Sequence, residues 1–287
     1  MMKRRFYFLA LAALLALPPA GAFAQENDTL AFERGFWLDM NQGEGLKLRL
    51  ASYNDGRPLF GSSQSLSVLI VSPERECALV AAPEGKLALT SEMAADAGAA
   101  AAVNGSFFHM KAPYGGSTYA RIDGVKVSEN APVENFRRDP QRSGAIVVSD
   151  GKFSIVTGFG PERTYEESLP GETVLTTGPM LLQAGDTCAL HPFKFNSNRH
   201  PRTAFGIRSD GSLVFVVADG RSPQAAGLSM AELRQVMLWL GCRDAINLDG
   251  GGSSTMVFLG RVVNHPCDNH QFDEAGERPV ANAFVIR

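Results

Sequence analysis

The chain has 287 residues, of which 45% are hydrophobic and 20% are charged, and its formal net charge is −3. This length and apolar content are enough for one large domain with a full hydrophobic core. A slightly acidic chain argues against binding to nucleic acid or electrostatic docking on an anionic membrane.

The first 24 residues have the three parts of a secretion signal. Basic residues at positions 3–5 precede an apolar run at 6–17, and Ala22-Phe23-Ala24 fits the small-x-small rule for a cleavage site. Twelve apolar residues are too few to span a bilayer core of about 30 Å, so no permanent membrane anchor is expected. Cleavage after Ala24 removes three basic and no acidic residues, which leaves a single domain, residues 25–287, with a net charge of −6. The sequence therefore predicts an exported protein, either periplasmic or secreted.

Strand-like segments dominate the rest of the chain. Residues 46–52 alternate between apolar and polar side chains, and residues 66–71 and 77–82 are short apolar runs. Asp-Gly pairs predict tight turns between neighbouring strands at three places, namely 123–124, 150–151 and 210–211.

Helices are few. Residues 90–98 form a short alanine-rich candidate, and residues 229–240 form a stronger one, with Ser229 and Glu232 as a capping box. The second helix lies between strand-like residues 213–218 and 244–249, which makes one βαβ-like unit. We therefore expect an α+β fold with a mixed, largely antiparallel sheet.

Four cysteines permit one or two disulfides in an exported protein, and reduced buried cysteines are the alternative. They are Cys77, Cys188, Cys242 and Cys267. Because Cys242 and Cys267 flank a glycine-rich segment, a bridge between them would brace it and would be worth roughly 3 kcal/mol in the chain-entropy model.

Polar residues follow several apolar strands directly. Asp219 ends the strand at 213–218, Asp249 ends the strand at 244–249, and Asn104-Gly105 follows the apolar residues 99–103. If the two strands of the βαβ-like unit are parallel, both aspartates lie at the edge of the sheet where ligands bind. Each aspartate alone is better explained as a turn former, but the two together, with Asn104 and the nearby arginines, indicate a shared cleft. Phe107 is expected to supply an apolar wall of that cleft.

Three consecutive glycines come directly after Asp249. Gly250, Gly251 and Gly252 let a ligand approach the backbone, and their N–H groups are suited to hold an anion. The hydroxyls of Ser253 and Ser254 are additional donors. An ordinary glycine-rich turn is the alternative.

Two arginines near these strand ends are candidates to grip a phosphate or carboxylate. Arg202 precedes a strand and Arg221 follows Asp219, and a solvated charge or an ion pair is the alternative for each. His265, Cys267 and His270 suggest zinc, but their spacing fits no standard site. Carboxylates and carbonyls also leave a divalent cation open, since no ligand spacing requires one. The sequence contains no nucleophile elbow, Walker loop or dinucleotide fingerprint.

Over residues 66–287, six blocks resemble the phosphodiester glycosidase family in order and approximate spacing. They are Asn104-Gly105-Ser106-Phe107-Phe108, Thr177-Gly178-Pro179, Pro201-Arg202-Thr203-Ala204-Phe205-Gly206, Ala218-Asp219-Gly220-Arg221, residues 228–232, and Asn247-Leu248-Asp249-Gly250-Gly251-Gly252-Ser253-Ser254. Ser106 departs from the usual pattern, which has glycine there. Arg221 also differs from the neutral polar residue of the best-understood relative.

The resemblance implies a hydrolase that cleaves the glycosidic side of sugar-1-phosphodiesters, of the N-acetylglucosamine-1-phosphate type, in a glycan or envelope polymer. It implies Asp249 and Asp219 as the catalytic carboxylates, without dividing roles between them. Arg202, Ser253 and the glycine amides would hold the phosphate, Asn104 and Asn247 would bind the sugar, and Thr203 would contact the substrate.

Two other functions stay open. One is a metal-assisted phosphodiesterase that cleaves the P–O bond, and the other is a glycan- or envelope-binding protein without activity. The metal requirement, the sugar, the stereochemical course and the oligomeric state do not follow from the sequence.

Overall fold

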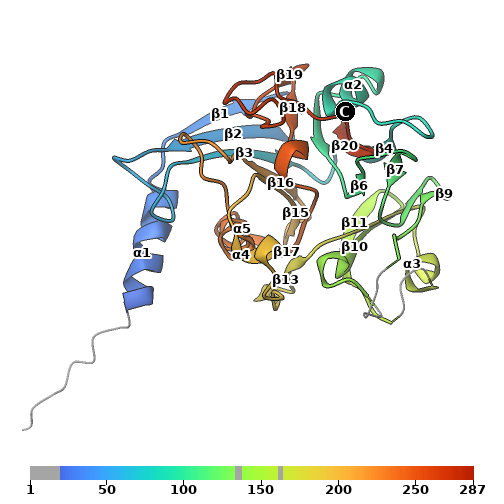
Figure 1. The fold of residues 1–287 in the computed structure, drawn as a ribbon, viewed down its shortest axis with the longest axis horizontal. Coiled ribbons are helices and arrows are strands. Elements are labelled where there is room, and N and C mark those ends of the chain that lie inside the picture. The colour runs from blue at the N-terminus through green and yellow to red at the C-terminus, as the bar shows by residue number, and fades with distance from the viewer. Residues whose placement is uncertain (1–19, 133–137, 161–163) are drawn as a thin grey trace, which may run out of the picture.

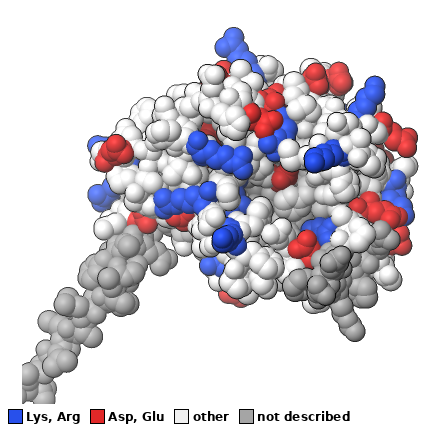
Figure 2. Space-filling view, in the orientation of Figure 1, with Lys and Arg blue, Asp and Glu red and all other residues white. Residues whose placement is uncertain are grey.

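The computed structural model describes residues 20–132, 138–160 and 164–287. Within these ranges strands outnumber helices and all strand pairs are antiparallel, which confirms the α+β prediction (Figure 1). On the face shown in Figure 2, basic and acidic side chains are interspersed.

The largest sheet runs through the centre of the molecule. Its eight strands have the order β1 (Trp37–Asn41), β2 (Leu46–Tyr53), β3 (Gln64–Val71), β16 (Leu213–Ala218), β15 (Arg202–Arg208), β17 (Cys242–Asn247), β13 (Met180–Gln183) and β14 (Asp186–Thr187). Helices α4 (Lys194–Ser197) and α5 (Met230–Trp239) lie together beside β13 and β17 (Figure 1).

Two five-stranded sheets and a short hairpin complete the fold. The first consists of β11 (Lys152–Thr157), β10 (Gly144–Ser149), β12 (Thr173–Thr177), β8 (Ala120–Ile122) and β9 (Val125–Ser128). The second consists of β19 (Arg261–Val262), β18 (Met256–Phe258), β5 (Ala101–Asn104), β20 (Asn282–Ile286) and β4 (Cys77–Ala81). The hairpin pairs β6 (Phe108–His109) with β7 (Gly115–Gly116). The other helical segments are α1 (Ala20–Glu33), α2 (Thr90–Asp96), α3 (Thr164–Ser168) and the 3₁₀ turns at Pro140–Arg142 and Gly251–Ser253.

Aromatic side chains join the three large sheets. Phe205 of β15 stacks on Phe284 of β20 at 5.8 Å between ring centroids, and Phe153 of β11 lies 5.7 Å from Phe205. Phe205 and Phe284 are completely buried. Since each ring comes from a different sheet, their burial fixes how the sheets meet, and with it the relative positions of the strand ends.

The local signals in the sequence have the expected effects. Each of the three Asp-Gly pairs connects adjacent antiparallel strands, and Asp150 and Gly151 take the positive φ values of 50° and 71° that a tight hairpin turn needs. The Ser229 hydroxyl accepts a hydrogen bond from the Glu232 N–H, and the Glu232 carboxylate accepts one from the Ser229 N–H. The predicted capping box therefore sets the start of α5.

Another of the expected strands is inserted into the βαβ-like unit. Strands β16 and β17 run in the same direction, as expected, but β15 lies between them and pairs antiparallel with both. The carboxyl ends of β16 and β17 therefore share one edge with the amino end of β15. This arrangement brings Asp219, Asp249 and Arg202 to the same edge.

The predicted signal peptide, except for residues 20–24, lies outside the described residues. Helix α1 runs across the predicted cleavage point, and at its end Phe32 stacks on Trp239 of α5 at 4.9 Å. None of the helices in the described part of the chain is long and apolar enough to cross a membrane.

The predicted disulfide is wrong, because all four cysteines are free thiols. Cys242 begins β17 and lies in the core, where a side chain on Gly206 would meet its sulfur at 2.7 Å. Cys267 lies at the other end of the strand, with its sulfur 3.7 Å from Arg221 Nη1. A strand of this length spans about 20 Å, whereas the Cα atoms of a disulfide lie within about 7 Å of each other.

Candidate active site

The candidate site lies where the ends of four strands meet. Asp219 follows β16, Asp249 is two residues beyond β17, and Pro201 precedes β15. The end of β5 reaches the same place from another sheet, because Asn104 bonds to the main chain at Asp249. The structure thus brings together the strand-end residues that the sequence singled out.

Asp249 is held by its main chain on both sides. Its N–H donates to the Gly105 carbonyl at 2.9 Å, and its own carbonyl accepts from Asn104 Nδ2 at 2.8 Å. The carboxylate oxygen Oδ1 accepts the N–H of Gly250 at 2.9 Å. Because the peptide groups are fixed, the carboxylate has a defined direction. The residue as a whole is partly exposed.

The pKa of Asp249 differs strongly from that of an ordinary aspartate. Burial raises this pKa to about 6, against the opposing effects of the Ser253 hydroxyl, the Gly250 amide and the charge of Arg278. At neutral pH the carboxyl group is therefore mostly ionised but easily protonated. A carboxyl group with its pKa raised in this way is typical of an active site.

The glycine loop lets two arginines approach the backbone beside Asp249. Gly251 has a φ of +65°, and a side chain there would meet Arg221 Nη2 at 3.0 Å. A side chain on Gly252 would meet Arg278 Nη2 at 2.5 Å. Two guanidinium groups therefore lie against the loop, and they make it a place for an anionic group such as a phosphate.

The two arginines differ in their exposure and in their bonding partners. The side chain of Arg278 is 19% exposed and forms an ion pair with Asp268, with Nε at 3.0 Å from Oδ1. Arg221 is exposed and contacts the sulfur of Cys267. Sequence reasoning selected Arg221 but missed Arg278, because Arg278 belongs to no motif and reaches the loop only through the fold.

Asp219 has a positioning role rather than an open carboxylate. It is 1% exposed, and its oxygens accept hydrogen bonds from the Ser65 hydroxyl at 2.7 Å and from Asn264 Nδ2 at 3.0 Å. Its Oδ2 also lies 2.8 Å from Nδ1 of His265, whose main-chain N–H donates to Oδ1. Asp219 therefore orients the His265 ring instead of facing a ligand itself.

The sequence analysis considered His265 only for zinc, and the structure places it against Asp219 instead. Its hydrogen bond to Asp219 raises the pKa of the imidazole, although burial opposes this effect. The ring stacks on Phe272 at 3.8 Å, and the side chain is 32% exposed. An Asp–His pair in which Nδ1 is held by the carboxylate leaves Nε2 to exchange a proton.

Two of the three residues considered for zinc contact other groups in the structure. Among the described residues, no three His, Cys, Asp or Glu side chains converge in a way that could hold a metal ion. His265 pairs with Asp219, and Cys267 lies beside Arg221. His265 and Cys267 are close in sequence, but their side chains contact different residues.

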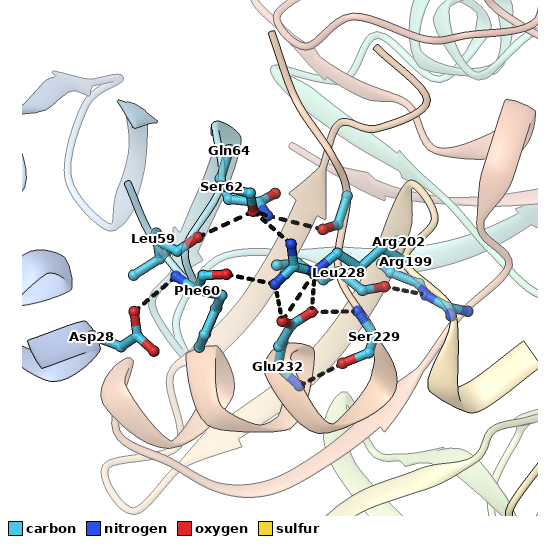
Figure 3. A network of polar contacts seen from close by, with 11 residues as sticks. Asp28, Leu59, Phe60, Ser62, Gln64, Arg199, Arg202, Leu228, Ser229 and Glu232 are labelled. Atoms are coloured by element: carbon cyan, nitrogen blue, oxygen red, sulfur yellow. Dashed lines mark hydrogen bonds and ion pairs between the residues drawn. The ribbon is translucent and has the colours of Figure 1, made fainter. Parts of the chain in front are cut away.

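Arg202 lies at the predicted edge but does not face a ligand. It is 1% exposed, its Nε donates to the Leu228 carbonyl at 2.9 Å, and Nη2 donates to the carbonyls of Phe195 and Asn198. Its guanidinium also stacks over the Phe195 ring at 4.7 Å. In Figure 3 the side chain points toward Leu228 and away from Glu232. Burial lowers the pKa of Arg202 to about 10.

We therefore expect Arg202→Lys to reduce stability. The three donors of lysine stand on a single nitrogen, which cannot replace the separate Nε and Nη2 of Arg202. Buried carbonyl groups therefore lose their donors, at a cost of about 2 kcal/mol or more in the free energy of unfolding. Urea unfolding measures this loss. Arg221→Lys is the matched control, since Arg221 is exposed, and it should change stability by less than about 0.5 kcal/mol. Equal stability of Arg202→Lys and the wild type would contradict the structural role.

Most of the remaining candidates hold the site together from inside. Asn104 is fully buried, and its Oδ1 accepts from the Thr203 hydroxyl and from the Thr255 N–H. Thr203 also contacts the Ser254 hydroxyl at 3.2 Å. Asn247 is fully buried and donates to the Gly178 carbonyl at 2.7 Å. These side chains connect the strands that form the site, although Oδ1 of Asn247 is buried without a hydrogen-bond partner.

Two features of the first family block also have structural reasons. A side chain on Gly105 would overlap Asn282 Oδ1, so only glycine fits there. Ser106 is buried, and its hydroxyl donates to the Thr176 carbonyl at 2.8 Å, which connects the site to β12. Phe107 is partly exposed and packs edge to face on Phe195 at 6.4 Å, as an apolar wall would.

Glu232 belongs to a separate network of polar contacts around Arg199. Besides capping α5, its carboxylate pairs with Arg199, whose Nη1 donates to the Ser62 hydroxyl at 2.7 Å (Figure 3). The network joins α5 to the segment before β3. Glu232 therefore has a complete structural role.

Several known proteins are similar to this chain in sequence or in fold. A family model described as phosphodiester glycosidase matches residues 97–287. The mouse N-acetylglucosamine-1-phosphodiester alpha-N-acetylglucosaminidase is 30% identical over 194 residues, which are 64% of this chain and 36% of the mouse protein. The human protein of the same name is 29% identical over equal shares. The chain thus spans about a third of the length of these curated relatives.

Solved structures show the same fold at low sequence identity. The catalytic domain of the zebrafish protein of that name, auto-inhibited by its pro-peptide, aligns with a TM-score of 0.63 and 17% identity over 88% of this chain and 81% of that one. A hypothetical protein from Synechocystis aligns with a TM-score of 0.57 and 15% identity, over 88% of this chain and 63% of that one.

Proposed function

Because the chain belongs to the phosphodiester glycosidase family, we propose that it hydrolyses sugar-1-phosphodiesters by breaking the bond between the sugar carbon C1 and the phosphate oxygen. The observation that best supports this reaction is the carboxylate of Asp249 next to a glycine loop against which the guanidinium groups of Arg221 and Arg278 lie. The negative charge of Asp249 suits a sugar carbon that becomes positive. The positive charges of the two arginines suit a phosphate that departs as an anion. The N-acetylglucosamine named in the mouse relative is the first sugar to test.

Arg221 and Arg278, with the amides of the glycine loop, are assigned to the phosphate. Their positive charges neutralise the charge that develops on the leaving oxygen. The leaving group is a phosphomonoester whose second pKa is about 6, so it departs with little help from an acid. The site therefore needs charge stabilisation more than proton donation at this step.

Asp249 is assigned to the sugar. Its ionised carboxylate stabilises the positive charge at C1 or bonds to that carbon, and the two possibilities give different stereochemical courses. His265 is assigned to the water molecule. With Nδ1 held by Asp219, its Nε2 takes a proton from water as the new C1–O bond forms.

The decisive experiment is hydrolysis in water labelled with oxygen-18, with a panel of sugar-1-phosphodiesters and separate readout of sugar and phosphomonoester. The proposal expects the label in the released sugar. Label in the phosphate would instead identify a phosphodiesterase that cleaves the P–O bond. Binding of the panel without any release of sugar would identify a glycan-binding protein.

We also propose that the chain is exported and processed after Ala24. The support is the basic, apolar and small-residue order of the first 24 residues. Mass spectrometry of protein recovered from the periplasm or medium should give Gln25 as the first residue. Met1 at the start of exported protein would contradict this prediction.

A further inference from the structure

A hollow of about 500 Å³ begins at Arg278, next to the glycine loop. Phe108 and Met110 line it from the β6–β7 hairpin, together with Tyr114 and Lys86. Arg278 belongs both to this hollow and to the candidate active site, since it lies against Gly252. A ligand whose phosphate occupies the glycine loop would therefore extend into this hollow.

A second hollow, of about 620 Å³, continues from the first. The two share Lys86 and Tyr114, and the second reaches Val125 and Val127 of β9. Strands β4, β6, β7 and β9 lie near one another on the right side of the molecule in Figure 1. We call the two hollows together the Tyr114 groove.

Four exposed apolar side chains line the Tyr114 groove. Met110 is 62% exposed, Tyr114 44%, Val125 64% and Val127 47%. Apolar side chains that gather at a hollow and remain in contact with water are typical of a binding site. Charged side chains line the groove as well: Arg278 forms an ion pair with Asp268 at the end nearest the active site, Lys86 lines both hollows, and Glu84 and Lys126 line the second.

We propose that the Tyr114 groove binds the second ester group of the substrate, and that this group is a long apolar chain. The substrate would then be a sugar joined through phosphate to a lipid alcohol. The proposal deepens the proposed hydrolase function and rests on it. With its phosphate at Arg278, such a chain would cover the exposed apolar side chains of Met110, Tyr114, Val125 and Val127 and remove them from water.

Hydrolysis of this substrate breaks and forms the same bonds as hydrolysis of the sugar-1-phosphodiesters proposed above. Oxygen from water bonds to C1 of the sugar, and the bond from C1 to the phosphate oxygen breaks. The electron pair of that bond stays on the phosphate, which leaves as a lipid phosphate monoester. One proton of the water goes to His265, and the free sugar is the other product.

The test uses two esters of N-acetylglucosamine-1-phosphate, one with methanol and one with decanol below its micelle concentration. In the wild type we expect kcat/KM to be at least about thirtyfold higher for the decyl ester, because apolar surface is buried only there. The variant Tyr114→Ser/Val127→Ser should lower the ratio of decyl to methyl kcat/KM by about tenfold or more. The control variant Phe36→Ser/Leu38→Ser, at exposed apolar residues outside the groove, should leave the ratio unchanged.

Binding of decyl phosphate, measured by calorimetry, tests the groove without turnover. We expect the groove variant to bind it about tenfold more weakly than the wild type or the control variant. Equal binding by all three proteins, or equal kcat/KM for the two esters in the wild type, would overturn the proposal. If neither ester is hydrolysed but the groove variant still binds decyl phosphate more weakly, the hydrolase function is wrong and the groove assignment stands.

Discussion

Asp249→Asn is expected to lower the turnover of a sugar-1-phosphodiester by at least about a hundredfold, the usual scale for a positioned charge or acid–base group. Asparagine keeps the size of the side chain and an oxygen that accepts the Gly250 N–H. The main-chain hydrogen bonds to Gly105 and Asn104 are unaffected. The variant should therefore fold with an unchanged melting temperature while the negative charge beside the sugar carbon is lost.

Glu232→Gln is the matched control for Asp249→Asn. Glutamine also completes a capping box, although the ion pair with Arg199 becomes a neutral contact. This variant should retain most of its turnover. An active Asp249→Asn together with a folded but inactive Glu232→Gln would show that the catalytic carboxylate has been placed on the wrong residue.

Asp219→Asn should lower kcat by about a hundredfold and also change its pH dependence. Asp219 raises the pKa of His265, and His265 accepts a proton only when its ring is neutral. Activity in the wild type should therefore fall as pH falls through this raised pKa. Without the charge of Asp219 the pKa of His265 drops, so the acidic limb of the kcat profile should move to lower pH. Protonation of Asp249, with its pKa of about 6, limits that movement.

The pH profile separates an effect on His265 from a general loss of structure, which would lower kcat without moving the limb. Asp273→Asn is the control, because Asp273 also raises the pKa of His265 but only through its charge and more weakly. It should shift the limb slightly and leave the maximum of kcat nearly unchanged. Should Asp219→Asn fail to fold, His265→Gln tests the same base at a partly exposed position. A kcat and profile like those of the wild type in either variant would refute the role of the pair.

Local chemistry in the sequence was enough to predict much of the fold. The capping box of Ser229 and Glu232 and the Asp-Gly turns depend on residues at most three positions apart, so no knowledge of the rest of the chain is needed. The common direction of β16 and β17 also followed from the helix between them. The insertion of β15 did not, because an antiparallel neighbour leaves no sign in the residues of either strand.

The side chains of the site were harder to predict for a specific physical reason. A sequence gives a residue type but not the partner that uses its hydrogen-bonding groups. Arg202 was expected to bind phosphate, yet its donors go to backbone carbonyls of Phe195, Asn198 and Leu228. Arg278 and His265 acquire their roles only through Gly252 and Asp219, which are distant in the chain.

The hydrogen bonds that hold the site have a further consequence for how the protein acquires it. Asn104 and Asp249 are separated by 145 positions, and Ser65 and Asp219 by 154. Closing such long loops has an entropic cost that local contacts do not recover. The catalytic geometry therefore has no stable precursor in any short fragment and forms only when sheets from both halves of the chain have docked. A partly folded molecule with most of its strands in place would still lack the site completely, so enzymatic activity is a stricter sign of native structure here than secondary-structure content.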